Sequence, residues 1–398
     1  MELLFFYPLV MTVVYLVGLI MYYIIIELPY QPIVDKDIQE GISFLIPCFN
    51  EEHTIEQTIL NLSQLSFENK ELIVINDGST DGTLAVIERL KESYSITILN
   101  FEENRGKGHG LNAALEYAKY DYVMCIDADT VIDDDAPYYM LEQFRKNQNV
   151  GAVTGNPRIR NKGNLIERLQ ILEYASIVGA IKKQQSLNGY VNTVSGVFVL
   201  FSKEAIQAVG GWDIDMITED IAISWKMHLE DWLVIYEPRA LCYMIAPNTL
   251  GGLFKQRIRW AQGGQEVVWR DGLKVIKKGN IPFILLLLEQ LTSILWSVSL
   301  MLTLLFGSVN YLVQLEGFQD INLILLSTFM LVTFNVIFFS ISLLVDSRYE
   351  QINLIYLLYL PWYPLFYWLL NAIASVVALP KSLTRKKGAY ATWTSPDR

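Results

Sequence analysis

Long uncharged hydrophobic stretches lie towards both ends of the chain, and a shorter-period pattern lies between them. No Asp, Glu, Lys or Arg occurs in residues 3–26, 290–315, 321–345 or 351–380. A helix needs roughly 20 apolar residues to cross the hydrocarbon core of a bilayer, so each stretch is long enough. The pattern predicts one N-terminal membrane span and at least three C-terminal membrane segments.

The N-terminal stretch predicts a retained anchor over residues 1–28. A cleaved signal peptide would begin with a basic region, have a shorter apolar core and end in small residues at the cleavage site. Glu2 is the only charged side chain before this run, and Glu27 and Pro29 follow it. These features favour a membrane helix that stays in the mature protein.

The C-terminal membrane region is predicted to occupy residues 281–380. Its first run is interrupted only by Glu289, and its length suits an interfacial helix followed by a span. Pro361 and Pro364 are expected to break the last segment, because proline removes a helical donor and clashes with the preceding turn. The basic tail, residues 381–398, favours the cytosol, yet three crossings from a cytosolic domain would place it outside. Either one of the segments is re-entrant or interfacial and does not cross the membrane, or the positive-inside rule does not hold for this tail.

Between residues 29 and 250, short apolar runs alternate with helical patterns, as in parallel strands joined by crossover helices. The predicted strands are 42–48, 71–76, 97–101 and 121–126, and the predicted helices lie near 52–65, 81–93 and 107–119. Nearly every strand ends in a polar cluster, and ligands of open α/β sheets bind at the carboxyl ends of strands. We expect an α/β nucleotide-binding domain with a mostly parallel sheet, followed by an interfacial helix region over 251–280.

Charge and cysteine content narrow the class of protein. Residues 27–280 hold 60 of the 73 charged residues, and the chain has a net charge of −11. This acidic balance gives no basic footprint for nucleic acid. The cysteines, Cys48, Cys125 and Cys242, are odd in number and far apart, so they indicate neither a disulfide framework nor a zinc site. A domain of ordinary charge is therefore expected in the reducing cytosol, next to the membrane segments.

Two aspartates follow the fourth predicted strand, in Asp127-Ala128-Asp129. A period of two places both carboxylates on one side, where they would repel each other unless a cation lies between them. Hard oxygen ligands suit Mg²⁺ or Mn²⁺, and Mg²⁺ is often held by one or two carboxylates plus substrate phosphates. The alternative is a solvated loop. The acidic triplet 133–135 is instead expected to cap the helix that begins at Ala136.

Other motifs also allow a purely structural interpretation. Asp77 begins a turn whose residues suit a helix cap. Lys107 follows a glycine loop and could either start a helix or face a phosphate. Glu219 and Asp220 precede an amphipathic stretch and suit a helix start, where a fixed carboxylate would also be a positioned base.

A fourth motif places Gln256, Arg259 and Trp260 at positions i, i+3 and i+4, hence on one helical face. An amide, a guanidinium and an indole side by side offer hydrogen bonding, anion pairing and a platform for stacking a sugar. A surface amphipathic helix is the alternative.

Taken together, the motifs resemble those of the family 2 processive glycosyltransferases, which include cellulose, chitin, hyaluronan and poly-N-acetylglucosamine synthases. In chain order they are Asp77, Asp127-Ala128-Asp129, Thr218-Glu219-Asp220 and Gln256 to Trp260. The stretches 153–160, 251–264 and 388–398 are similar to the poly-N-acetylglucosamine branch, and this resemblance spans nearly the whole chain.

The resemblance implies a GT-A-like fold and a role for each matched residue. Residues expected to bind the donor nucleotide are Asn50, Glu51, Asp77 and Lys107. Asp127 and Asp129 would hold Mg²⁺ or Mn²⁺ on the UDP diphosphate. Asp220 would be the general base. Those expected at the diphosphate and the acceptor sugar are Gln256, Arg259 and Trp260, with Arg158 and Glu219 as further candidates.

The resemblance also implies a function. An inverting, membrane-bound enzyme of a bacterial plasma membrane would polymerise UDP-GlcNAc into poly-β-1,6-GlcNAc, a biofilm exopolysaccharide, with a small membrane partner subunit and coupled export. Other polymer synthases, and a non-processive enzyme that transfers one sugar to polyprenyl phosphate, are alternatives. A non-catalytic nucleotide-sensing scaffold is disfavoured, because a sensor needs no base.

Overall fold

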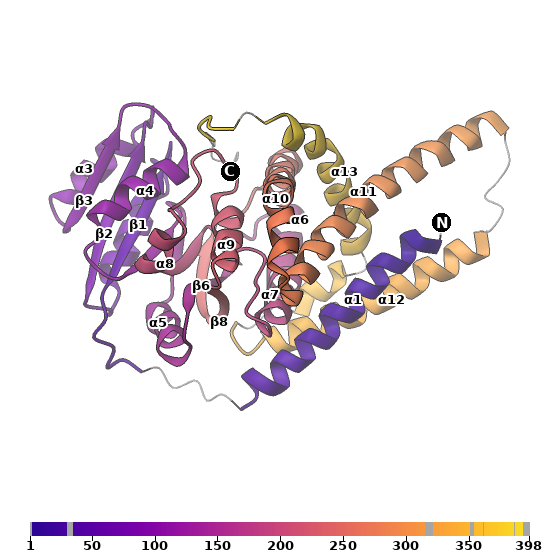
Figure 1. Ribbon diagram of the computed structural model, residues 1–398, viewed down its shortest axis with the longest axis horizontal. Helices are drawn as coiled ribbons and strands as arrows, with labels where there is room; N and C mark the ends of the chain where they lie inside the picture. Colours follow the sequence, from indigo (N-terminus) through magenta and orange to yellow (C-terminus); the bar gives the residue numbers. More distant parts are fainter. Residues whose placement is uncertain are drawn as a thin grey trace.

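The computed structural model describes residues 2–29, 35–314, 321–350, 354–360, 362–385 and 387–392. Figure 1 shows an α/β domain on one side of the molecule and long helices on the other, with α10 and α13 between them. The long helices come from the two ends of the chain, and the α/β domain comes from the residues between them.

An eight-stranded sheet forms the centre of the α/β domain, in the order β3-β2-β1-β4-β7-β6-β8-β5. The strands are β1 Ile42–Cys48, β2 Lys70–Asp77, β3 Ile96–Phe101, β4 Tyr122–Ile126, β5 Val131–Ile132, β6 Val150–Ile159, β7 Phe198–Ser202 and β8 Leu233–Met244. β1 pairs in parallel with β2 and β4, and β2 with β3, whereas β7 runs antiparallel to both β4 and β6. The α/β class with a mostly parallel sheet is therefore confirmed.

Helices cover both faces of this sheet. They are α2 Ile55–Gln64, α3 Thr83–Lys91, α4 Lys107–Tyr117, α5 Ala136–Lys146, α6 Leu165–Glu173, α7 Gly179–Ser186, α8 Lys203–Ala208 and α9 Glu219–Leu229. Alternation along β1 sends Phe44 and Ile46 into one hydrophobic core and Leu45 into the other. Burial on both faces explains why β1 is a continuous apolar run in the sequence.

Four helices among the described residues are long and apolar enough to cross a membrane. They belong to α1 Glu2–Tyr22 with its π-helical end Tyr23–Glu27, α11 Ile281–Gln314, α12 Ile321–Asp346 and α13 Trp362–Thr384. α1 packs against α12, and α13 packs against α11 and against α10, Leu250–Lys278. A short 3-10 helix, Leu354–Tyr359, precedes α13, so the last segment is interrupted. Pro364 does not break it, because this residue lies in the first turn of α13, and Pro361 lies outside the described residues.

One local expectation was wrong, and a second is confirmed only in part. α11 is one continuous helix, not an interfacial helix followed by a span. Its charged residue Glu289 is accommodated because its carboxylate accepts hydrogen bonds from the Tyr15 hydroxyl at 2.8 Å and the Gln185 amide at 3.4 Å. Asp135 occupies the N-cap position of α5 but makes no side-chain cap bond, and pairs with Lys36 at 2.8 Å.

Both ends of the α13 region contact the α/β side of the molecule. Tyr359, just before it, lies 3.4 Å from Arg168 of α6. At its far end, Arg385 pairs with Glu266 of α10 at 2.7 Å. In Figure 1, α13 runs beside α10 and across the direction of α1 and α12. α13 therefore lies along the boundary between the domain and the other long helices.

Candidate active site

Four of the predicted site residues meet where the strands of the parallel half of the sheet end: Lys107, Asp127, Glu219 and Arg259. A small pocket there is lined by Lys107, Gly108, Asp127, Met216, Ile217, Glu219, Arg259 and Ala391. These residues come from the start of α4, the end of β4, the start of α9, the middle of α10 and the C-terminal tail. Segments far apart in the sequence thus meet at the edge that the strand pattern indicated.

Lys107 contacts two carboxylates and a backbone carbonyl at this pocket. Its ammonium group lies 2.6 Å from the Asp127 carboxylate and 3.2 Å from the Glu219 carboxylate, and it donates to the Gly196 carbonyl at 2.9 Å. Burial alone would lower the pKa of Lys107, but the two carboxylates outweigh burial and raise that pKa. Lys107 is therefore a fixed positive charge that faces the pocket.

Asp220, the expected base, is held in the first turn of α9. Its Oδ1 accepts the backbone N–H of Ile221 at 2.9 Å, and the Thr218 side chain at the N-cap makes no cap bond. Burial first, and then the neighbouring charge of Glu219, raise the pKa of Asp220 to about 6, against the opposing charge of Lys107. A carboxylate with that pKa is charged at neutral pH and is a stronger proton acceptor than an ordinary aspartate.

Asp127 and Asp129 are the expected ligands of a divalent cation. Asp127 is partly exposed and already faces the positive charge of Lys107, while Asp129 is buried and accepts from the Thr130 hydroxyl at 3.1 Å. No group of three His, Cys, Asp or Glu residues suited to a metal occurs in the described part of the chain. Two carboxylates with positions left for phosphate oxygens and water match the donor set that Mg²⁺ and Mn²⁺ accept.

The expected uridine-side residues lie at neighbouring strand ends and loops, and each is hydrogen-bonded to an adjacent segment. Both carboxylate oxygens of Asp77 accept backbone N–H groups, from Arg105 at 3.0 Å and Gly106 at 2.8 Å. Asn50 accepts from the Thr80 backbone at 2.8 Å, and the backbone N–H of Glu51 donates to the Thr83 hydroxyl at 2.8 Å. Asp77 therefore shapes the loop that leads into Lys107.

The α10 motif faces two cavities. Arg259 lines the pocket that holds Lys107, whereas Trp260 lines a larger cavity on the membrane side. The Oε1 atom of Gln256 is buried and has no hydrogen-bond partner among the described residues. Gln256 itself lines neither of these two cavities.

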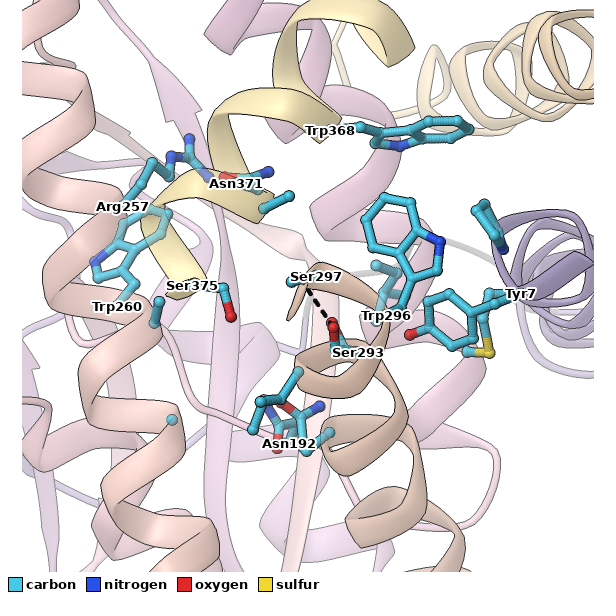
Figure 2. A pocket seen from close by; sticks show the side chains of 18 of the residues that line it. Tyr7, Asn192, Arg257, Trp260, Ser293, Trp296, Ser297, Trp368, Asn371 and Ser375 are labelled. Carbon is cyan, nitrogen blue, oxygen red and sulfur yellow. Dashed lines mark hydrogen bonds between the residues drawn. The ribbon is translucent and has the colours of Figure 1, made fainter. Parts of the chain in front are cut away.

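The larger cavity has a volume of about 450 Å³ and lies among α1, α10, α11 and α13. Figure 2 shows Trp260 and Arg257 on one side and the rings of Tyr7, Trp296 and Trp368 on the other, with Asn192, Ser293, Asn371 and Ser375 between them. Such a mixture of aromatic faces with amide and hydroxyl groups suits a neutral polar ligand, since rings stack and polar groups hydrogen-bond.

Charge in this cavity is neutralised within the protein. Among its described lining residues other than tyrosine, only Glu173 and Arg257 are ionisable. They form a two-bond ion pair, with Nη1–Oε1 at 2.7 Å and Nη2–Oε2 at 2.5 Å. The Arg257 guanidinium also lies 4.5 Å from the Trp260 ring centroid and braces that ring.

The C-terminal tail closes one side of the Lys107 pocket. Ala391 lines the pocket, and its backbone N–H donates to the Ile214 carbonyl at 2.9 Å. Gly106 has a φ of 88°, and a Cβ there would come within 2.3 Å of the Ala391 carbonyl oxygen. The Tyr390 ring packs edge-on against His109, with the Arg105 guanidinium 6.0 Å from its centroid.

Arg158 lies elsewhere. Its guanidinium is buried and pairs with the Asp346 carboxylate at the end of α12, at 2.6 and 2.8 Å. It lines neither of the two cavities described above. No local sequence pattern indicates this partner, 188 residues away, or the bracing pair of Glu173 and Arg257, which are 84 residues apart.

Comparisons with known proteins agree with this geometry. A family model described as Glycosyl transferase family 2 matches residues 43–210. The poly-β-1,6-N-acetyl-D-glucosamine synthases of Staphylococcus epidermidis and Staphylococcus aureus are 49% and 50% identical, over 99% of this chain and 97% of theirs. The mannosyltransferase PcManGT from Pyrobaculum calidifontis, solved with GDP-Man and Mn²⁺, has a similar fold, with a TM-score of 0.66 at 19% identity over 96% of this chain and 99% of that one.

Proposed function

The chain belongs to glycosyltransferase family 2, and from that premise we propose that it polymerises N-acetylglucosamine from UDP-GlcNAc into poly-β-1,6-GlcNAc. The enzyme is membrane-bound, inverting and processive, and it passes its product into the cavity beside Trp260. The long staphylococcal synthase match supports the donor and the linkage.

One observation carries the proposal: the two residues that flank Asp220 line different cavities, although Asp220 itself lines neither. Glu219, before it, lines the pocket with Lys107, Asp127 and Arg259, and Ile221, after it, lines the membrane-side cavity. The first cavity offers cations for a diphosphate, and the second offers rings and amides for a neutral sugar. A base at their boundary is where donor and acceptor would meet.

The reaction is a single displacement. Asp220 accepts the proton of the 6-hydroxyl on the terminal acceptor sugar, and that oxygen attacks the anomeric carbon of α-linked UDP-GlcNAc. The new C–O bond forms on the face opposite the departing UDP, so the product linkage is β. Asp220 then releases the proton to water. General-base assistance of this kind contributes about 10²- to 10⁴-fold.

Lys107 and Arg259 balance the charge that develops on the departing UDP, and hydrogen-bonded cations of this kind bind phosphate strongly. We include a divalent cation, Mg²⁺ or Mn²⁺, held by Asp127 and Asp129. When bound, it supplies Lewis-acid stabilisation of the leaving diphosphate. Asn50, Glu51 and Asp77 form the uridine side of the site in this proposal.

We also propose that the polymer is exported through the protein. A chain of polar sugars cannot cross hydrocarbon, where each unsatisfied polar group is costly. The neutral lining of the Trp260 cavity suits uncharged N-acetylglucosamine, and it disfavours hyaluronan, whose glucuronate would bring an uncompensated carboxylate. A small membrane partner subunit, which the family resemblance implies, would complete this path.

We further propose that α1, α11 and α12 cross the plasma membrane and that α13 lies along its cytosolic face. The contacts of Tyr359 with Arg168 and of Arg385 with Glu266 support this, because the α13 region touches the α/β side at both ends. The N-terminus is then outside, and both the catalytic domain and the basic tail are cytosolic, as the positive-inside rule favours.

The test is product analysis with defined donors. Membranes that contain the protein are incubated with labelled UDP-GlcNAc and Mg²⁺ or Mn²⁺, with or without UDP-glucuronate, and the products are separated by size. A long polymer from UDP-GlcNAc alone supports the proposal. A product that requires UDP-glucuronate would indicate hyaluronan, and a single sugar on extractable lipid would indicate a polyprenyl-phosphate transferase.

A further inference from the structure

A turn of four residues, 194–197, connects the parts of the site that the proposed function uses. The Gly196 carbonyl accepts from Lys107, and the Val197 carbonyl accepts from the backbone N–H of Asp127 at 3.2 Å. The Val194 N–H donates to the Ser224 hydroxyl at 3.0 Å, which in turn donates to the Asp220 carbonyl at 2.7 Å. The turn is thus bonded to both the donor side and the base helix.

The base rests directly on this turn. A Cβ on Gly196 would lie 3.0 Å from Oδ2 of Asp220, tighter than nearly all contacts of real Cβ atoms. The carboxylate of Asp220 therefore abuts the backbone at Gly196. A shift of the turn by a few tenths of an ångström would shift the base relative to the acceptor hydroxyl.

Lys182 of α7 supports the turn from its other side. Its ammonium group donates to the Ser195 hydroxyl at 2.5 Å and to the Thr154 hydroxyl at 3.3 Å. The Thr154 hydroxyl also accepts the Ser195 backbone N–H at 2.8 Å, so β6, α7 and the turn form one network. Lys182 is buried and lines neither of the two described cavities.

Burial of a lysine charge is costly unless hydrogen bonds or an opposite charge compensate it. Burial lowers the pKa of Lys182 to about 8, and the nearby negative charge of Asp220 opposes that effect, so the side chain is an ammonium at neutral pH. Its hydrogen-bond partners are two neutral hydroxyls, with the Tyr236 ring centroid 5.8 Å away. The adjacent Lys183, by contrast, pairs with the Glu27 carboxylate at 2.8 Å.

We propose that Lys182 is a positioning residue for the general base, which fixes the Ser195–Gly196 turn against which the Asp220 carboxylate rests. The inference depends on the proposed function, because it assigns Asp220 the role of base. Lys182 touches no substrate: it acts through the turn, by holding the base in reach of the acceptor hydroxyl.

The experiment compares two neighbouring buried lysines in the full-length protein. Lys182→Met, which keeps the volume and removes the charge, is expected to lower kcat by about 10- to 100-fold, the cost of a slightly misplaced catalytic group, with little change in KM for UDP-GlcNAc. Lys183→Met is the matched control. It leaves Glu27 without its partner and is expected to lower Tm but not the kcat of the folded protein.

Ser195→Ala provides a second variant in case Lys182→Met does not fold. It removes one acceptor of the ammonium group and is expected to lower kcat in the same direction by a smaller factor. The inference is overturned if the variant that folds keeps the wild-type kcat, or if Lys183→Met loses as much kcat as Lys182→Met. A wild-type enzyme that makes no polymer from UDP-GlcNAc, or an Asp220→Asn enzyme that remains fully active, would instead refute the proposed function.

Discussion

The chemistry of the site depends on two adjacent carboxylates with different surroundings. Glu219 pairs with Lys107 at 3.2 Å, whereas Asp220 has no ion-pair partner within 4.0 Å among the described residues. The charge of Glu219 therefore contributes to the raised pKa of its neighbour. Two neighbouring carboxylates with such different surroundings are typical of sites in which one carboxylate acts as a base and the other shifts the pKa of that base.

The pKa of Asp220 predicts the acid side of the pH profile. Because the base must be deprotonated to accept a proton, kcat/KM is expected to fall below about pH 6, by about tenfold per unit. Glu219→Gln removes a negative neighbour, lowers the pKa of Asp220 and moves this limb to lower pH. Initial rates of UDP release from pH 4.5 to 8 measure both profiles, and identical limbs in the two proteins would contradict the account.

The positions of some site residues could be predicted from the sequence, and those of others could not. The positions of Asp127 just after β4 and of Asp220 in the first turn of α9 could be predicted, because strand ends and helix starts have local sequence signals, and the roles of both residues stay predictions. The pairing of Arg158 with Asp346 and the position of Lys182 could not be predicted. A lysine in an amphipathic helix has the same local pattern whether it faces water or a turn of another segment.

At the scale of elements, buried ion pairs join the sheet to the long helices. Arg158 at the end of β6 and Asp346 at the end of α12 are each 3% exposed. Asp346→Leu leaves the guanidinium buried without its main partner and is expected to destabilise the protein by about 3 to 5 kcal/mol. Thermal unfolding in detergent measures the loss.

The double variant Arg158→Met with Asp346→Leu is the control for this prediction. It removes both charges and is expected to recover most of the lost Tm, since a buried ion pair and a hydrophobic pair of similar volume are often comparable in stability. If Asp346→Leu alone unfolds at the wild-type temperature, β6 and α12 are not coupled through this pair.

The tail is an element whose position follows from packing and not from any local pattern. Arg385 pairs with Asp215 at 2.9 Å, the Gly388 N–H donates to the same carboxylate at 2.9 Å, and Ala391 reaches the Lys107 pocket. Removal of residues 387–398 is expected to admit water, so that UDP-GlcNAc is hydrolysed severalfold faster without acceptor while polymer synthesis falls.

Separate assays of UDP release and polymer formation test this prediction. Tyr390→Ala removes only the ring that packs on His109 and is expected to show the same change to a smaller extent. A truncated protein with the wild-type ratio of transfer to hydrolysis would show that the tail does not close the site.

Periodic elements were predicted better than their ends and connections. β1 was predicted with its observed bounds, Ile42–Cys48, because burial on both faces produces an uninterrupted apolar run. The continuity of α11 was missed, because the bonds that Glu289 receives from Tyr15 and Gln185 come from segments far away in the sequence. Long-range partners of this kind leave no local signal.

At the scale of the whole molecule, the proposed topology has the tail and the catalytic domain on the same side of the membrane. The three native cysteines are buried, so single cysteines can be introduced as labels. In intact cells, an impermeant thiol reagent is expected to label Gln314→Cys, at the C-terminal end of α11, and to spare Gly388→Cys, which reacts only after the membrane is opened. Labelling of Gly388→Cys in intact cells would show that α13 crosses the bilayer.

The central proposal is that Asp220, whose neighbours line two cavities, acts as the base of an inverting enzyme. This enzyme builds a β-1,6-linked chain of N-acetylglucosamine. The most direct test is linkage and anomeric analysis, by NMR, of the polymer that wild-type membranes make from UDP-GlcNAc, with Asp220→Asn membranes assayed in parallel. The account predicts β-1,6-linked N-acetylglucosamine from the wild type and a rate lower by about 10² or more for Asp220→Asn. An α-linked polymer, or near-normal synthesis by Asp220→Asn, would contradict it.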